Sequence, residues 1–290
     1  MKRLLHGLLR SLKVRSDFFA EKSDLRKYLS SGQKPWTKGY SKYKEMFISK
    51  TLHDDNLLMT FLHQGLLPAN YGFRLDERCI EYPWLFSRLS LTDQSLLDAG
   101  SALNFDYLLN LEVLKNRNIV IYTLSPEDTL SRSNISYIYG DLRRTIIRSE
   151  HFDEIVCIST LEHIGMDNTV LYSKDGRFAE SRVDDYRIVV KELKRLLKFG
   201  GRLFITVPYG NYHNHHWLQV FDKAMLNNIL KEFDGTECQI TYYRYNPDGW
   251  QLSSADDSAH CTYFDIHQGQ DYDFDYAAAA RAVACMVLTK

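Results

Sequence analysis

Short apolar runs alternate with helical segments from residue 95 to the end of the chain. The first five runs are 95–99, 119–122, 135–139, 154–158 and 202–207. They are mostly apolar instead of alternating with polar residues, as expected for strands that are buried on both faces of a parallel sheet. The pattern therefore predicts an α/β domain over residues 91–290.

Two helices and two further strands complete the predicted sheet. One helix starts at Asp184 or Asp185 and a second near Asp222, each with one apolar stripe. Strands at 238–245 and 281–288 follow. We expect a doubly wound, Rossmann-like sheet of seven strands. In such sheets ligands bind beyond the carboxyl ends of the strands, where the strand order reverses.

Residues 1–90 show no clear strand and predict a helical extension or cap. Asp54 is placed to cap a helix that carries Leu57 and Phe61 on one face. Charged and aromatic residues are mixed in 34–40 and 76–84. Such stretches can line a polar pocket, although solvated packing loops are the commoner interpretation.

The start of the chain predicts a basic amphipathic helix. Its basic residues are Lys2, Arg3, Arg10, Lys13 and Arg15, and no acid precedes Asp17. Such a helix can lie on an anionic membrane surface, and the alternative is a frayed or partner-docked terminal helix. Because His6, Gly7 and Arg10 interrupt the apolar residues, a signal peptide is not expected, and no apolar run is long enough to predict a transmembrane helix.

Charge and cysteine usage restrict the partners and the compartment. Thirty-six basic and 37 acidic residues leave a net charge of −1, so no overall field favours binding to nucleic acid. The five cysteines are widely separated, without the spacing of a zinc site or a disulfide framework. They are typical of a reducing compartment, and we expect a cytoplasmic protein, with a peripheral position on the inner membrane face as the alternative.

Four blocks then occur in a characteristic order: Leu-Asp-Ala-Gly at 97–100, Phe-Asp-Glu-Ile-Val-Cys-Ile-Ser-Thr-Leu-Glu-His-Ile-Gly at 152–165, Leu-Lys-Phe-Gly-Gly-Arg-Leu at 197–203 and Val-Pro at 207–208. Together they resemble the signature of class I S-adenosylmethionine-dependent methyltransferases. The resemblance covers residues 95–210 and implies S-adenosylmethionine as the cofactor. It also implies an antiparallel last strand.

The resemblance further implies cofactor-binding residues after each of the first four strands. These are Asp98, Ala99, Gly100, Ser101 and Asn104, then Thr123, then Asp141 and Leu142, and finally Ser159 and Thr160. The turn at Asp98–Ser101 would lie under the methionine, Thr123 at the ribose, and Asp141 and Leu142 at the adenine.

Two departures from the family pattern affect this predicted site. The first turn has Gly100, Ala102 and Asn104 where three glycines are usual, so side chains at 102 and 104 are expected to narrow the crevice. Thr123 replaces the acid that usually binds the ribose, which costs about one decade of affinity. Glu127 and Asp128 are placed to compensate for the missing acid at the ribose. The alternative is that residues 125–128 are a capped helix start.

Histidines after the fourth and fifth strands are the candidate bases. His163, beside Glu162, follows the fourth strand, and imidazole titrates near neutral pH. The equal alternative is that both residues only hold the loop by hydrogen bonds. His213 lies in a histidine-rich stretch, 213–216, that could bind acceptor, proton or metal, but its spacing predicts no metal site. The acidic stretch at 271–276 predicts an exposed edge strand rather than a calcium loop.

We therefore expect a methyltransferase that acts on an oxygen of a small-molecule or glycan acceptor, with His163, Glu162 and His213 as candidate catalytic residues. The block at 159–165 and Asp-Gly-Trp at 248–250 resemble sequence segments of enzymes that modify bacterial polysaccharides or sugar conjugates. The alternative is a binding or scaffold protein of the same fold without efficient turnover. A short-chain dehydrogenase is disfavoured, because its Tyr-x-x-x-Lys spacing occurs only at Tyr40 and Lys44, before the first strand.

Overall fold

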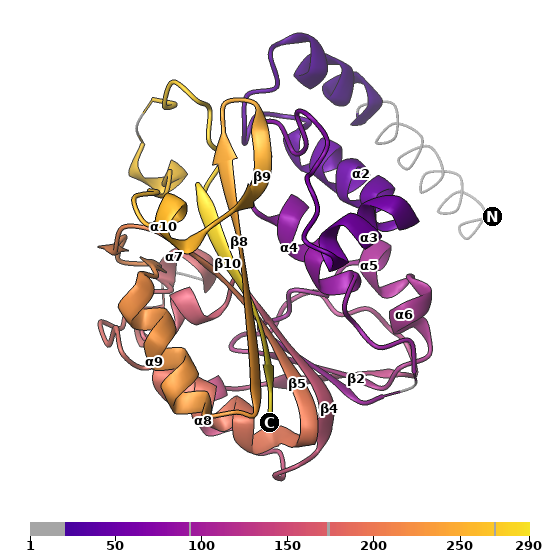
Figure 1. Ribbon diagram of the computed structural model, residues 1–290, viewed down its shortest axis with the longest axis vertical. Coiled ribbons are helices and arrows are strands. Elements are labelled where there is room, and N and C mark those ends of the chain that lie inside the picture. Colours follow the sequence, from indigo (N-terminus) through magenta and orange to yellow (C-terminus); the bar gives the residue numbers. More distant parts are fainter. Residues whose placement is uncertain (1–20, 93, 173–174, 270) are drawn as a thin grey trace, which may run out of the picture.

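The structure is a computed structural model that describes residues 21–92, 94–172, 175–269 and 271–290. The predicted basic helix at the start of the chain lies outside these residues. At the centre is an eight-stranded mixed sheet (Figure 1). Its strands are β1 (Leu96–Ala99), β2 (Ile119–Thr123), β3 (Ile135–Tyr139), β4 (Phe152–Ile158), β5 (Leu197–Pro208), β8 (Glu237–Asn246), β9 (Gly249–Ser253) and β10 (Ala282–Thr289).

The strand order confirms the predicted fold class. It is β3-β2-β1-β4-β5-β10-β8-β9, with β1 to β5 parallel to one another. The last strand, β10, pairs antiparallel with both β5 and β8, as the sequence implied. The order reverses beside β1, where Asp98 is in register with Ile121 of β2 on one side and with Val156 of β4 on the other. That position is the switch point at which a ligand is expected.

The structure contains strands that the sequence did not predict. All seven predicted strands are present, but β9 adds an eighth through a tight turn in which Gly249 has a φ of 113°. A Cβ on Gly249 would lie 2.4 Å from the Tyr71 carbonyl oxygen. Trp250 is buried and donates to the Leu75 carbonyl, so the Asp-Gly-Trp block holds the N-terminal segment. A separate two-stranded sheet joins β6 (His213–Asn214) to β7 (Gln219–Val220).

The predicted edge strand at 271–276 is wrong. These residues form no strand, and two of their three acids pair with an arginine instead of facing solvent along a sheet edge. Arg281 donates to Asp273 at 2.5 Å and to Asp275 at 2.8 Å. Asp275 is buried, so the acidic pattern reflects ion pairing within a loop.

Helices cover both faces of the sheet (Figure 1). On one face lie α2 (Tyr40–Leu52), α3 (Asp55–Leu62), α4 (Arg78–Phe86), α5 (Asp106–Leu109) and α6 (Glu112–Lys115), and on the other lie α8 (Tyr186–Leu196) and α9 (Lys223–Phe233). The short helices α7 (Thr169–Tyr172) and α10 (Ala255–Ser258) belong to connecting segments. Helices α8 and α9 start at the predicted positions, and Asp54 caps α3 by accepting from the Leu57 N–H. The predicted helix start at 125–128 is wrong, since those residues are irregular.

The N-terminal segment packs directly on the sheet. Helix α4 is buried from Cys79 to Phe86, so the charged and aromatic stretch 76–84 is not the solvated loop that we favoured. The ring of Trp84 meets Phe204 of β5 edge to face, with 6.1 Å between centroids. Residues on both sides of position 90 thus share one core, and the division there stays a prediction. No helix within the described ranges has the length and apolar character to cross a membrane.

Candidate functional site

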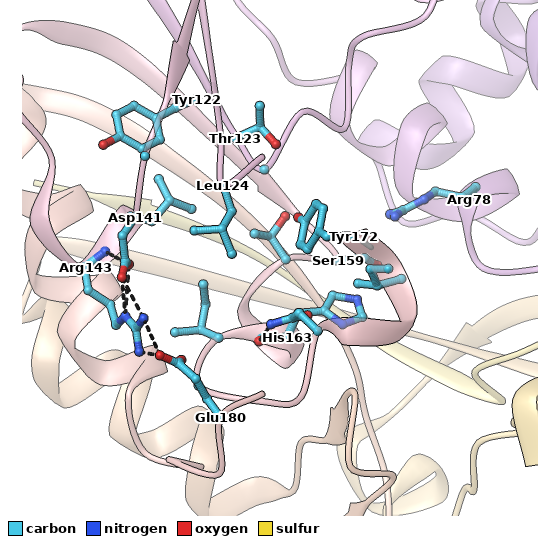
Figure 2. A pocket seen from close by; sticks show the side chains of 18 residues that line it. Arg78, Tyr122, Thr123, Leu124, Asp141, Arg143, Ser159, His163, Tyr172 and Glu180 are labelled. Carbon is cyan, nitrogen blue, oxygen red and sulfur yellow. Dashed lines mark hydrogen bonds and ion pairs between the residues drawn. The ribbon is translucent and has the colours of Figure 1, made fainter. Parts of the chain in front are cut away.

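A crevice of about 270 Å³ opens at the carboxyl ends of the parallel strands, beside the switch point. Seven of the predicted site residues line it: Gly100, Thr123, Asp141, Leu142, Ser159, Thr160 and His163. Figure 2 shows Thr123, Tyr172, Ser159 and His163 around one opening, with Arg78 reaching toward it from α4. The crevice thus lies where the strand ends predicted a ligand site.

Asp98 stabilises the first turn from inside the protein and does not line the crevice. It is fully buried, and its carboxylate oxygens accept from the backbone N–H groups of Ala102 at 3.0 Å and Leu103 at 2.8 Å. Burial raises the pKa of Asp98 to about 7, although the two N–H donors act to lower it. The neighbouring Ala99 is also fully buried, and Ser101 takes a left-handed φ of 63°.

The two missing glycines do not close the crevice. Neither Ala102 nor Asn104 is among the residues that line it. Asn104 is turned away, because its Nδ2 donates to the Asp128 carbonyl at 2.9 Å and its Oδ1 accepts from the Tyr137 hydroxyl at 2.9 Å. The narrowing that we expected at these positions is absent.

Gly100 is the position at which the turn needs a glycine. Its φ of 118° is strained for any L side chain, and an added Cβ would lie 2.1 Å from Thr160 Oγ1. The turn after β1 and the end of β4 therefore approach each other closely, with the crevice between them.

Asp141, predicted at the adenine, is already engaged by a neighbouring arginine. Arg143 donates to its carboxylate from Nε at 2.9 Å and from Nη2 at 2.6 Å. Burial acts to raise the pKa of Asp141, but the hydrogen bonds from Arg143 lower it overall. The same guanidinium also pairs with Glu180 and Asp185. Asp141 thus lines the crevice as part of an ion-pair network.

Helix α4 contributes two residues that we did not predict. The carboxylate of Glu81 is completely buried, and its Oε1 accepts from both Ser159 Oγ and Thr206 Oγ1 at 2.6 Å. Its Oε2 accepts from Arg78 Nη1 at 2.6 Å, and Arg78 lines the crevice. Glu81 therefore connects α4 to the ends of β4 and β5. The mixed charges in 76–84 were the only signal for these residues in the sequence.

His163 has the protonation state that a base requires. Its Nδ1 lies 2.9 Å from the Trp217 carbonyl oxygen. A carbonyl only accepts, so Nδ1 carries the proton and Nε2 keeps its lone pair. Burial lowers the pKa of His163 to about 4, with a smaller upward effect of the hydrogen bond to the Trp217 carbonyl. The ring is therefore neutral at neutral pH.

The other two candidate catalytic residues lie outside the crevice. Glu162 is buried, and burial together with nearby Glu81 raises its pKa well above the usual range. His213 is exposed, and its ring centroid is 4.4 Å from that of His215, which lies 3.3 Å from Asp265 Oδ2. Among the described residues, no group of three or more His, Cys, Asp and Glu is arranged to hold a metal ion.

An aromatic cluster of Trp217, Tyr263 and His267 adjoins His163. The indole of Trp217 stacks on His163 at 5.3 Å and meets Tyr263 and His267 edge to face at 6.4 and 5.0 Å. Its Nε1 donates to Asp265 at 3.1 Å, which fixes the orientation of the ring. This cluster packs against the candidate base, and its three side chains are not among the residues that line the crevice.

Comparison with known proteins gives likeness of fold only. No family model matches the chain, and no curated protein matches it. Solved structures similar to it include a SAM-dependent methyltransferase from Methanosarcina mazei, 11% identical over 71% of this chain and 96% of that one, with a TM-score of 0.39. Another is the 1,6-didemethyltoxoflavin-N1-methyltransferase of Burkholderia thailandensis with bound S-adenosylhomocysteine, at 14% identity, 68% and 71% coverage and a TM-score of 0.38.

A third is a SAM-dependent methyltransferase from Thermotoga maritima, 11% identical over 84% of this chain and 99% of that one, with a TM-score of 0.41. Scores in this range carry no argument about function. The function proposed below therefore rests on the residues of this chain.

Proposed function

We propose that the protein is an S-adenosylmethionine-dependent methyltransferase. The observation that carries this proposal is the open crevice at the switch point. Residues at the ends of β1, β2 and β4 line it, including Gly100 in the turn after β1. Asp98 stabilises that turn from inside the protein. Ala102 and Asn104, which stand where glycines are usual, do not line the crevice. The scaffold alternative loses its motivation, because it depended on a crevice that was narrowed.

The lining residues fit the parts of an adenosyl sulfonium. Arg78 suits the carboxylate of the amino acid, since a guanidinium matches a carboxylate in geometry and charge. The Thr123 hydroxyl suits a ribose hydroxyl. Leu142, Ile164 and Tyr172 supply apolar and aromatic surface for a flat base. The residues that line the crevice therefore carry chemistry that suits each part of the cofactor.

We assign the base to His163. When bound, S-adenosylmethionine supplies a methyl group whose transfer to an acceptor hydroxyl forms an O–C bond, breaks an S–C bond and releases the hydroxyl proton. The lone pair on His163 Nε2 accepts that proton, and the Trp217 carbonyl holds the ring in the required tautomer. Most of the remaining rate enhancement comes from positioning in a site shielded from water.

For the acceptor we propose a sugar or a polysaccharide-related molecule. Sugar rings stack on aromatic side chains, and the aromatic cluster of Trp217, Tyr263 and His267 lies beside His163. The fold itself does not determine the acceptor, so this assignment depends on the aromatic cluster alone.

The test is methyl transfer from labelled S-adenosylmethionine to a panel of monosaccharides and sugar nucleotides. His163→Ala should lower kcat at least about a hundredfold, as expected when a general base is lost, while the affinity for S-adenosylhomocysteine stays within about twofold of wild type. His260→Ala, at an exposed histidine away from the crevice, is the matched control and should keep wild-type turnover. Turnover of His163→Ala close to wild type would rule out His163 as the base.

The pH profile tests the same assignment. Burial lowers the pKa of His163 to about 4, so the unprotonated, competent form persists at pH values well below the ordinary pKa of histidine. We expect kcat/KM to stay level down to about pH 5. It should fall only as the pH approaches the pKa of the base in the free enzyme. A fall centred near the ordinary histidine pKa would contradict the assignment.

A further inference from the structure

A buried carboxylate outside the crevice is connected to the candidate base through one aromatic residue. Asp265 precedes the short helical turn Ile266–Gln268 and is 1% exposed. It is not among the residues that line the crevice, and the proposed transfer gives it no role. Its hydrogen bonds show what it does.

The two oxygens of Asp265 bind in different directions. Oδ1 accepts from the backbone N–H of His267 at 3.0 Å, which fixes the carboxylate to its own segment. Oδ2 accepts from Trp217 Nε1 at 3.1 Å and from Gln268 Nε2 at 3.2 Å. His215 Nδ1 lies 3.3 Å from the same oxygen. Oδ2 therefore connects the segment before β10 to the turn between β6 and β7.

Trp217 in turn contacts His163 in two ways. Its backbone carbonyl oxygen lies 2.9 Å from His163 Nδ1, and its indole stacks on the imidazole with 5.3 Å between centroids and 30° between planes. A neutral imidazole carries its proton on either nitrogen, and only the carbonyl selects Nδ1 here. Because the indole and the carbonyl belong to one residue, fixing the indole also fixes the residue against His163.

The turn that carries Trp217 forms without Asp265. The His215 N–H donates to the Leu218 carbonyl at 2.9 Å, and the Asp167 N–H donates to the His216 carbonyl at 2.8 Å. In contrast, the Asp265 carboxylate is the only hydrogen-bond acceptor of the Trp217 indole N–H within the described ranges. A change at Asp265 should therefore release the indole while the turn stays folded.

With the proposed function as its basis, we propose that Asp265 is a positioning residue for the base. By accepting from the Trp217 indole N–H, it holds that residue against His163, so that the proton stays on Nδ1 and the lone pair stays on Nε2. Asp265 acts only through Trp217, and it neither binds the cofactor nor takes a proton in the transfer.

The test begins with Asp265→Asn in the full chain. The amide keeps an oxygen for the His267 N–H and turns its nitrogen toward the Trp217 indole N–H, so two donors face each other. Nitrogen-15 NMR of labelled histidine reads the tautomer of His163 at pH 7, because burial lowers the pKa of His163 to about 4 and the ring is neutral there. Wild type should show the Nδ1–H form alone, and Asp265→Asn a mixture with the Nε2–H form.

Turnover should follow the tautomer. In Asp265→Asn we expect kcat to fall about tenfold to a hundredfold, the range that corresponds to one lost hydrogen bond to a charged group. The affinity for S-adenosylhomocysteine should stay within about twofold of wild type. A merely structural role would lower the thermal unfolding temperature and leave the tautomer unchanged.

A double-mutant cycle tests whether Asp265 acts through the indole. Trp217→Phe keeps an aromatic ring and the backbone carbonyl but removes the N–H donor, so by itself it should give the same mixture of tautomers. Adding Asp265→Asn to it should change kcat by less than about twofold, because the two residues share one interaction. Equal losses in both backgrounds would overturn the inference.

Asp273→Asn is the matched control, since Asp273 is an acid of the same segment that pairs with Arg281 instead. It should keep the wild-type tautomer and turnover. An unchanged tautomer in Asp265→Asn, or an equal change in Asp273→Asn, would overturn the inference while leaving the proposed function in place. Absence of methyl transfer by wild type would contradict the proposed function, whereas the NMR measurement still decides whether Asp265 holds His163 in one tautomer.

Discussion

At the residue scale, the crevice depends on the close approach of Gly100 to Thr160. A side chain at position 100 would meet the Thr160 side chain in three contacts shorter than 3.0 Å, and the φ of 118° is unfavourable for any L residue. Either effect displaces the turn or the end of β4, and both line the crevice.

We therefore predict that Gly100→Ala weakens S-adenosylhomocysteine binding at least about a hundredfold, which is the effect of losing about 2.7 kcal/mol of binding free energy. The measurement is the ligand-induced shift in thermal unfolding temperature. Gly176→Ala is the control, because an added Cβ there meets nothing within 4 Å. Equal shifts in the two variants would show that the turn does not contact the ligand.

Residues that line the crevice could be predicted when they stand at the end of a strand or within five residues after it, and their roles stay predictions. Gly100, Thr123, Ser159 and His163 were found in this way, because the carboxyl ends of parallel strands meet at one edge. Arg78 and Asn168 were missed. The first belongs to a helix that precedes β1, and the second follows β4 by ten residues, so only the folded chain brings them to the crevice.

At the element scale, a buried ion pair stabilises the sheet at the amino ends of its parallel strands, opposite the crevice. Glu154 of β4 is 1% exposed and Arg117, just before β2, is 2% exposed, with 2.7 Å between Oε2 and Nη2. Arg202 of β5 pairs with the same carboxylate. Removing the charge of Glu154 leaves Arg117 buried without its counterion.

Glu154→Gln should therefore lower the free energy of unfolding by about 3–5 kcal/mol, measured by urea denaturation. Glu112→Gln is the matched control, because its partner Lys115 is more than half exposed and exposed pairs contribute little. If the two variants have the same free energy of unfolding, the buried pair does not stabilise the sheet.

The strands were predictable where burial on both faces leaves an apolar run, as in β2 and in the second half of β4. Strand β9 was missed because its alternating residues carry no such run, and only its turn at Asp248 and Gly249 marks it. The acidic loop at 271–276 was assigned to a strand because its alternation imitates an exposed edge. Arg281, which explains that pattern, is not adjacent to the run, and its pairing appears only in the folded chain.

At the scale of the whole molecule, the N-terminal helices and the sheet build one site together. Glu81 of α4 binds Ser159 and Thr206 at the ends of β4 and β5, and Arg78 of the same helix lines the crevice. The sequence predicted only an extension over these residues, because no local pattern shows which face of the sheet a helix will cover. A ligand in the crevice contacts both parts and should stabilise the molecule as a unit.

The most direct test of the central claim is isothermal titration of the full chain with S-adenosylhomocysteine. The crevice described above predicts saturable binding at one site with a micromolar dissociation constant. Absence of any heat of binding at millimolar ligand would contradict it.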